Sequence, residues 1–78
     1  MSTALILPRL GRTDQEATIL FWLKKVGDRI EPGDLVVEIE TEKAVLQVEA
    51  LVGGTITKIL VHEGETALIG DALAMVDG

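Results

Sequence analysis

The sequence contains no cysteine and no tyrosine, and only one phenylalanine and one tryptophan, in 78 residues. Without cysteine the chain has no disulfide framework, no thiolate zinc site and no cysteine nucleophile. A small domain without such cross-links depends on its hydrophobic core, and 47% of the residues are hydrophobic. The length predicts a single domain over residues 1–78 with one small core.

Basic residues are also scarce. The sequence has seven lysines and arginines and thirteen aspartates and glutamates, which gives a net charge of −6. This balance argues against nucleic-acid binding, which needs clustered lysine and arginine, and against an anionic membrane surface. No apolar run is long enough to span a membrane. The opening MSTALILPRLG is interrupted at Pro8 and Arg9, too early for a signal peptide. We therefore expect a cytosol-like compartment, either the bacterial cytoplasm or the mitochondrial matrix.

Helical periodicity is weak, and short β-rich runs closed by Gly, Pro or Asp recur instead. The predicted strands are 4–8, 17–23, 35–40, 45–50, 55–61 and 72–76, with very short strands at 29–31 and 66–68. This spacing predicts an all-β domain, a small sandwich or flattened barrel.

The two halves of the sequence resemble each other at an offset of 37 residues. Gly27 aligns with Gly64 and Gly33 with Gly70, so both halves have two glycines six residues apart. Glycine at such positions supplies turn geometries that a Cβ disfavours. The alternative is chance similarity between two β segments interrupted by glycine. We predict two half-domains around a pseudo-two-fold axis, with the hairpin at 40–45 and the chain termini at opposite ends.

Residues 35–50 read LVVEIETEKAVLQVEA, and apolar and polar residues alternate on both sides of a four-residue break. Leu35, Val37 and Ile39 alternate with Val36, Glu38 and Glu40, which predicts an antiparallel hairpin with one buried face. Residues 41–44 are compatible with a type I turn.

Lys43 is predicted to project into solvent from this turn, surrounded by Glu38, Glu40, Glu42 and Glu49. A Schiff-base or general-base lysine needs apolar or cationic surroundings instead. The residues alone therefore favour a simple solubility role, and a handle presented to another protein is the alternative.

The stretch Glu40-Thr41-Glu42-Lys43-Ala44 is similar to the acid–Thr/Ser–acid–Lys–Ala turn of lipoyl domains. The resemblance covers almost the whole chain, including Ala17-Thr18-Ile19 with Trp22, Val26-Gly27-Asp28, Gly33-Asp34, Gly53-Gly54-Thr55-Ile56, Glu63-Gly64 and Gly70-Asp71. It implies two four-stranded antiparallel sheets related by a pseudo-two-fold axis, and lipoic acid joined as an amide to Lys43. It also implies that a lipoyl ligase reads Glu40 and Gly27, together with the turn residues Glu42 and Ala44. Glu42 replaces the aspartate more usual before the lysine.

The resemblance further implies a non-catalytic, monomeric carrier domain of a dihydrolipoamide acyltransferase in a 2-oxo acid dehydrogenase complex. The implied partners are a lipoyl ligase or lipoyl transferase, a thiamine-diphosphate-dependent decarboxylase, the acyltransferase core and the flavoprotein dihydrolipoamide dehydrogenase. A loop about five residues longer than its counterpart before Gly54 is implied to help partner recognition; it comprises Arg9, Leu10, Gly11, Arg12, Thr13, Asp14, Gln15 and Glu16.

Two alternatives remain beside the lipoyl interpretation. Biotinyl domains modify a lysine that usually lies between two methionines, whereas the neighbours here are Glu42 and Ala44. An unmodified β interaction module is the other alternative. Independent catalysis is not expected, because one His and one Ser provide no nucleophile–base–orienter set. The acidic residues are spread along strands, without the spacing of a metal loop, and Trp22 is predicted to pack in or beside the core.

Overall fold

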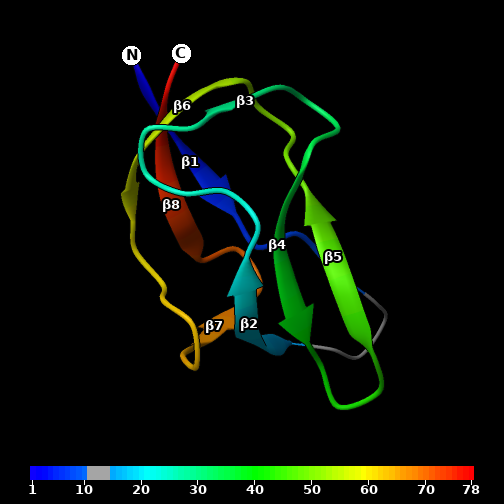
Figure 1. Cartoon of the computed structure of the whole chain (residues 1–78). Helices are drawn as coiled ribbons and strands as arrows, with labels where there is room; N and C mark the ends of the chain where they lie inside the picture. Colours follow the sequence, from blue (N-terminus) through cyan, green and yellow to red (C-terminus); the bar gives the residue numbers. More distant parts are fainter. Residues whose placement is uncertain (11–14) are drawn as a thin grey trace.

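The computed structural model describes residues 1–10 and 15–78, and its regular elements are all β-strands. They are β1 Ser2–Ile6, β2 Glu16–Trp22, β3 Arg29–Ile30, β4 Leu35–Glu40, β5 Val45–Glu49, β6 Gly54–Ile59, β7 Thr66–Leu68 and β8 Ala72–Asp77. The strands form two four-stranded antiparallel sheets, which confirms the predicted fold class (Figure 1). Over the described residues, no helix exists that is long and apolar enough to cross a membrane.

The sheet with the order β1-β8-β6-β3 carries both chain ends and is called the terminus sheet. The sheet with the order β5-β4-β2-β7 carries the β4–β5 connection and is called the hairpin sheet. Aliphatic side chains from both sheets fill the space between them, and the largest fully buried ones are Leu7, Ile19, Ile30, Ile39, Ile56, Leu73, Val36, Val37 and Val76. β-Branched residues dominate this set, as expected of side chains that pack well on pleated surfaces.

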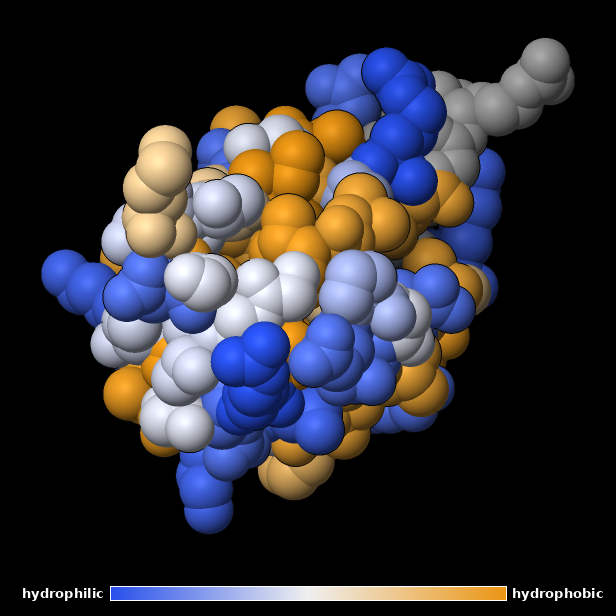
Figure 2. Space-filling view, turned by 90° about the horizontal axis from the view of Figure 1, so that it is seen from above, coloured by the Kyte–Doolittle hydropathy of each residue, from blue (hydrophilic) through white to orange (hydrophobic). Residues whose placement is uncertain are grey.

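Some apolar side chains remain outside this core. Figure 2 views the domain from the end that carries the termini and shows apolar side chains gathered at the surface. A groove of about 220 Å³ is lined by Ala4, Leu5, Ile6, Glu49, Leu51 and Val52. It lies between β1 and the end of β5, the edge strands of the two sheets.

The two half-domains are joined by a symmetric exchange of backbone hydrogen bonds. The amide of Gly27 donates to the carbonyl of Ile56, and the amide of Gly64 donates to the carbonyl of Ile19, both over 2.8 Å. Each partner in the second bond lies 37 positions from its counterpart in the first, so the predicted repeat is confirmed. Gly27 and Gly64 have φ angles of 97° and 87°, which glycine adopts without the steric cost of a Cβ.

A second pair of bonds extends the same symmetry to the edge strands. Gly33 donates to the carbonyl of Ala50, and Gly70 donates to the carbonyl of Leu7, again over 2.8 Å. Ala50 directly follows β5 and Leu7 directly follows β1, so these strands are also equivalent. They are 43 positions apart rather than 37, because the segment between β1 and β2 is longer than the segment between β5 and β6.

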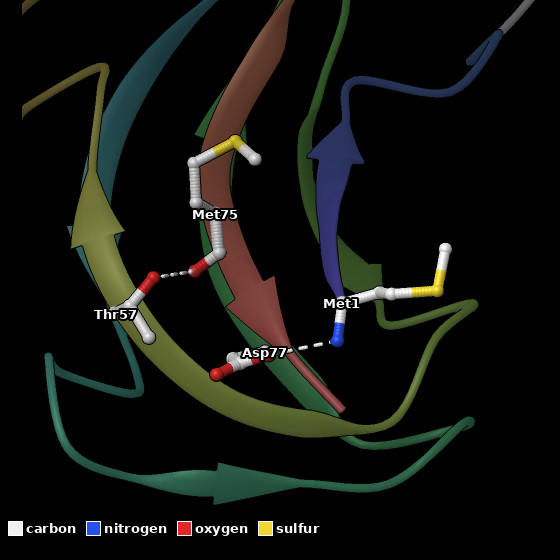
Figure 3. Close-up of polar contacts among 4 residues, drawn as sticks. All are labelled: Met1, Thr57, Met75 and Asp77. Atoms are coloured by element: carbon white, nitrogen blue, oxygen red, sulfur yellow. Dashed lines mark hydrogen bonds and ion pairs between the residues drawn. The ribbon is translucent and has the colours of Figure 1, made fainter.

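The hairpin and the chain termini lie at opposite ends of the domain, as the repeat predicted (Figure 1). The terminal amino group of Met1 lies 3.3 Å from the carboxylate of Asp77 (Figure 3), and the Gly78 amide donates to the Met1 carbonyl over 3.3 Å. The equivalent bond in the other half runs from the Thr41 amide to the Ala44 carbonyl over 2.8 Å and closes the hairpin. The β4–β5 connection therefore occupies the position where the other half has its chain ends.

The predicted alternation in β4 is wrong at its beginning. Val36 and Val37 are both buried, and Leu35 is 41% exposed instead of sharing the inner face with Val37. The cause is a β-bulge between Leu35 and Val37, where the pairing with β5 shifts by one residue. The outer half of the hairpin keeps the predicted alternation, because Ile39 is buried and Glu40 is exposed.

Strand ends also differ from the prediction by one or two residues. β1 spans Ser2–Ile6 rather than 4–8, since Pro8 has no amide hydrogen to donate to a neighbouring strand. β6 ends at Ile59 rather than at residue 61. The amides of Leu60 and Val61 instead both donate to the Leu73 carbonyl, which turns the chain away from the ladder.

Replacing Gly54 by alanine is expected to lower the free energy of unfolding by about 3 kcal/mol. Gly54 has a φ of 142°, and a Cβ would lie 2.5 Å from the backbone oxygen of Asp77. The matched control is Gly53→Ala, whose Cβ would meet the Pro32 side chain at 3.3 Å, and a change within about 1 kcal/mol is expected. Urea unfolding of the three proteins measures this difference, and equal stability of the two variants would contradict the packing described here.

Candidate functional site

The candidate site is the hairpin formed by β4 and β5. Cross-strand pairs hold it in register, with Glu38 opposite Gln47 and Glu40 opposite Val45. β4 also pairs with β2 on its other side, so the hairpin is anchored in the middle of a sheet. The connection 41–44 extends beyond this anchored part and carries Lys43.

Thr41 organises the tip of the hairpin. Among the described residues it is the only polar one that is buried, with 8% exposure. Its hydroxyl oxygen accepts hydrogen bonds from the amides of Lys43, over 3.3 Å, and Ala44, over 3.2 Å. The hydroxyl also lies 3.3 Å from the Ala44 carbonyl, to which it donates. A side-chain hydroxyl therefore binds both amides of the turn, a role that sequence reasoning did not assign to this residue.

Lys43 is an exposed residue at the tip, and its side-chain amine is a group that can form an amide with a carboxylic acid. Glu42 precedes it in the turn, and Glu40 ends β4 directly before the turn; both side chains are exposed. The prediction that Glu49 also surrounds the lysine is wrong, whereas Glu38 lies in β4 two residues before Glu40. Glu49 is opposite Leu35 at the far end of the hairpin, since successive residues of a strand advance about 3.3 Å each.

A depression of about 550 Å³ lies beside the hairpin and is lined by Gln15, Glu16, Ala17, Thr18, Glu40, Thr41, Glu42 and Thr66. It brings the end of the predicted recognition loop, Gln15 and Glu16, next to the hairpin residues Glu40 and Glu42. Leu10 packs against the core, and Arg9 is exposed. The loop residues Gly11, Arg12, Thr13 and Asp14 lie outside the described residues.

Gly27 is not part of the hairpin end. It lies between β2 and β3, in a connection that runs toward the end of the domain with the termini (Figure 1). Its amide binds Ile56 in the terminus sheet. This bond gives Gly27 a role in joining the half-domains, and its recognition by a lipoyl ligase stays a prediction.

The remaining candidate residues lie apart from the hairpin. His62 is exposed in the connection between β6 and β7, and Ser2 is exposed in β1. Trp22 is partly buried against the core, as predicted, and its indole nitrogen donates to the Val61 carbonyl over 2.9 Å. Within the ranges 1–10 and 15–78, no three His, Asp or Glu side chains are grouped so that they could hold a metal ion.

Comparison with protein families and relatives gives one consistent group of matches. The sequence profile of the family described as "Biotin-requiring enzyme" matches residues 3–76. The chain is 45% identical over 64 residues to the dihydrolipoyllysine-residue acetyltransferase component of the pyruvate dehydrogenase complex of Rickettsia bellii. It is 40% identical over 77 residues to the dihydrolipoyllysine-residue succinyltransferase component of the 2-oxoglutarate dehydrogenase complex of Rickettsia typhi. These matches cover 82% and 99% of this chain but only 15% and 19% of the relatives.

Two solved structures share the fold. The lipoyl domain of the 2-oxoglutarate dehydrogenase complex from Azotobacter vinelandii matches with a TM-score of 0.70 and 31% identity, over 96% of this chain and 98% of that one. The urea carboxylase of Kluyveromyces lactis matches with a TM-score of 0.79 and 27% identity, over 99% of this chain but only 6% of that one.

Replacing Thr41 by valine is expected to lower the free energy of unfolding by about 1–2 kcal/mol, because the amides of Lys43 and Ala44 lose their buried acceptor. The control Thr41→Ser keeps the hydroxyl and is expected to retain most of the stability. Chemical denaturation measures both effects. A loss of stability for serine with none for valine would show that the methyl group, and not the hydroxyl, stabilises the turn.

Proposed function

The chain belongs to the biotin/lipoyl attachment family, and we propose from this premise that it carries lipoic acid on Lys43. It is a lipoyl-type carrier domain and not an enzyme in its own right, since it matches a solved lipoyl domain over nearly the whole of both chains. The proposed role is to shuttle acyl groups and reducing equivalents within a 2-oxo acid dehydrogenase complex. The curated relatives that it matches are acyltransferase components of such complexes, and the chain spans less than a fifth of their length.

The observation that carries the proposal is the position of Lys43 on the pseudo-two-fold domain. The fold needs a chain reversal after β4, and Lys43 is exposed at the tip of this reversal, 41–44, at the end opposite the termini. Glu40 and Glu42 flank it with exposed carboxylates. The amine is thus held on a rigid support, away from any chain that would join the domain at its termini.

Lipoic acid on this amine would supply a dithiolane that accepts an acyl group together with two electrons and releases them in later steps. The residues of this chain attach and present that group. Thr41 fixes the turn amides, and the β4–β5 ladder fixes the direction in which residue 43 points. The proposed partners are a lipoyl ligase or transferase, a thiamine-diphosphate-dependent decarboxylase, an acyltransferase core and a flavoprotein dihydrolipoamide dehydrogenase. A loop at 9–16 remains a proposed recognition element, supported by the position of Gln15 and Glu16 beside the hairpin.

A biotinyl carrier is the second candidate. The structural match to a urea carboxylase and the description of the family favour it. The residues beside Lys43 argue against it, because the methionines of biotinyl turns are replaced by Glu42 and Ala44. The two curated matches described above are both dihydrolipoyllysine acyltransferase components, which favours the lipoyl assignment.

Co-expression with a lipoyl ligase in one culture and a biotin ligase in another tests the assignment. We expect the intact mass to increase by one amide-linked lipoyl group in the first culture and to stay unchanged in the second. Lys43→Arg should abolish the increase, and the control Lys58→Arg should leave it intact, because Lys58 lies in β6 of the terminus sheet. A biotin adduct on Lys43, or a lipoyl adduct that persists in Lys43→Arg, would contradict the proposal.

Gly27→Ala and Gly64→Ala form a symmetric pair that separates ligase recognition from folding. Both glycines have a positive φ, both have open space within 4 Å of the point where an alanine Cβ would lie, and both make equivalent bonds. We therefore expect equal destabilisation, of about 1–2 kcal/mol. We also expect equal rates of lipoylation at a temperature where both variants are folded. A loss of lipoylation confined to Gly27→Ala would show that the ligase contacts this residue directly.

A further inference from the structure

Two consecutive apolar side chains point outward from the middle of the hairpin sheet. A β-bulge between Ile19 and Phe21 shifts the pairing of β2 with β4. As a result Leu20 and Phe21 are both on the surface, with exposures of 36% and 56%. Phe21 is the single phenylalanine of the sequence. A contact that covered this ring would remove a large apolar area from water, which is favourable.

The other half of the domain shows that the fold does not require apolar residues at this bulge. β6 has the same bulge where it pairs with β8, between Ile56 and Lys58. The residues equivalent to Leu20 and Phe21 are Thr57 and Lys58, which are exposed and polar. The Thr57 hydroxyl donates to the Met75 carbonyl over 3.3 Å (Figure 3). The apolar pair in β2 is therefore a property of the hairpin sheet and not of the bulge.

Carboxylates border Phe21 on the neighbouring elements. Glu38 is directly opposite in β4, and its carboxylate accepts a bond from the Gln47 side chain over 3.4 Å. On the other side, the carboxylate of Glu63 accepts from the Trp22 amide over 3.0 Å. The four strands of this sheet contain no lysine or arginine, whereas the terminus sheet contains Arg29 and Lys58.

The same face continues to the hairpin tip. Glu40 lies two residues beyond Glu38, about 7 Å along β4, and it is opposite Val45, which is 53% exposed. Leu20, Phe21, Glu38, Glu40 and Val45 are called the Phe21 face. An enzyme that covers the Phe21 face would thus also reach the turn that carries Lys43.

The negative charge of the Phe21 face determines which kind of partner surface is complementary to it. Two copies of this chain that met through their Phe21 faces would bring carboxylates together, and each copy carries a net charge of −6. A complementary surface has an apolar pocket for Phe21 and lysine or arginine side chains beside it. A guanidinium or ammonium group there could pair with Glu38 and lie over the aromatic ring.

We propose that the Phe21 face is the docking surface for the decarboxylase component that loads the arm, and that Phe21 is its central apolar anchor. This inference rests on the proposed lipoyl function. An acyltransferase core within the same polypeptide is held near the domain by tethering, which supplies an effective concentration of the order of mM. We take the decarboxylase to be a separate chain without that advantage, so that it needs a contact surface. Aromatic residues centred in polar surroundings are typical of such contacts.

The first test does not depend on lipoylation. The unmodified ¹⁵N-labelled domain is titrated with purified pyruvate- and 2-oxoglutarate-decarboxylating components of the source organism, one at a time. We expect one of them to broaden or shift the amide signals of Leu20, Phe21, Glu38 and Gln47, while those of Thr57 and Lys58 stay unchanged. Effects confined to the terminus sheet, effects from neither component, or effects seen only with the flavoprotein or on raising the domain concentration alone would overturn the proposal.

The second test compares equivalent positions of the two halves in the lipoylated domain. Phe21→Lys gives the hairpin sheet the residue found at the same place in the terminus sheet, and Lys58→Ala is the matched control. We expect Phe21→Lys to lower kcat/KM for reductive acylation about tenfold through KM. For Lys58→Ala, kcat/KM should stay within about twofold of the value for the domain without substitutions. Both variants should be lipoylated as fast as that domain. Equal kcat/KM for the two variants would overturn the role of Phe21, whereas failure of all proteins to be lipoylated would instead contradict the proposed function.

Discussion

The exchange of backbone hydrogen bonds between the two half-domains is the interaction on which the rest of the structure depends. Each half contributes a glycine turn whose amide binds a strand of the other half, from Gly27 to Ile56 and from Gly64 to Ile19. Neither half could bury its aliphatic face alone, because the core is formed by side chains from both sheets. The two bonds therefore join the half-domains at symmetric points, one on β6 of the terminus sheet and one on β2 of the hairpin sheet.

This symmetry also decides where the hairpin lies. The bond from Thr41 to Ala44 closes β4 onto β5, and the equivalent bond from Gly78 to Met1 brings the chain ends together. At one end of the domain the chain continues from β4 into β5, and at the other end lie the termini. A group attached at the continuous end is kept apart from the rest of a longer polypeptide, which suits a carrier that has to visit several active sites. Attachment of such a group requires that the tip be accessible and that its direction be fixed.

Much of this arrangement could be predicted from the sequence, because glycine spacing and the offset of 37 reflect backbone geometry directly. β4 and β7 have the predicted bounds, and the lysine is at the predicted tip. The bulge that buries both Val36 and Val37 could not be predicted, since it depends on pairing with β5. Two consecutive valines do not indicate in the sequence where such a bulge will form. The hydrogen bonds of the Thr41 hydroxyl were missed for a related reason, because only the folded turn shows which amides need an acceptor.

Sequence differences between the two halves are informative about function where the backbone of the two halves is equivalent. Phe21 and Lys58 occupy equivalent positions beside equivalent bulges, so the backbone explains neither residue.

We propose above all that the domain carries acyl groups at the hairpin tip. The most direct measurement is mass analysis of the lipoylated domain after incubation with each decarboxylase component and its 2-oxo acid. We expect an acyl increment on the peptide that contains Lys43 with one of these components. A fully lipoylated domain that remains unacylated with all of them would contradict this proposal.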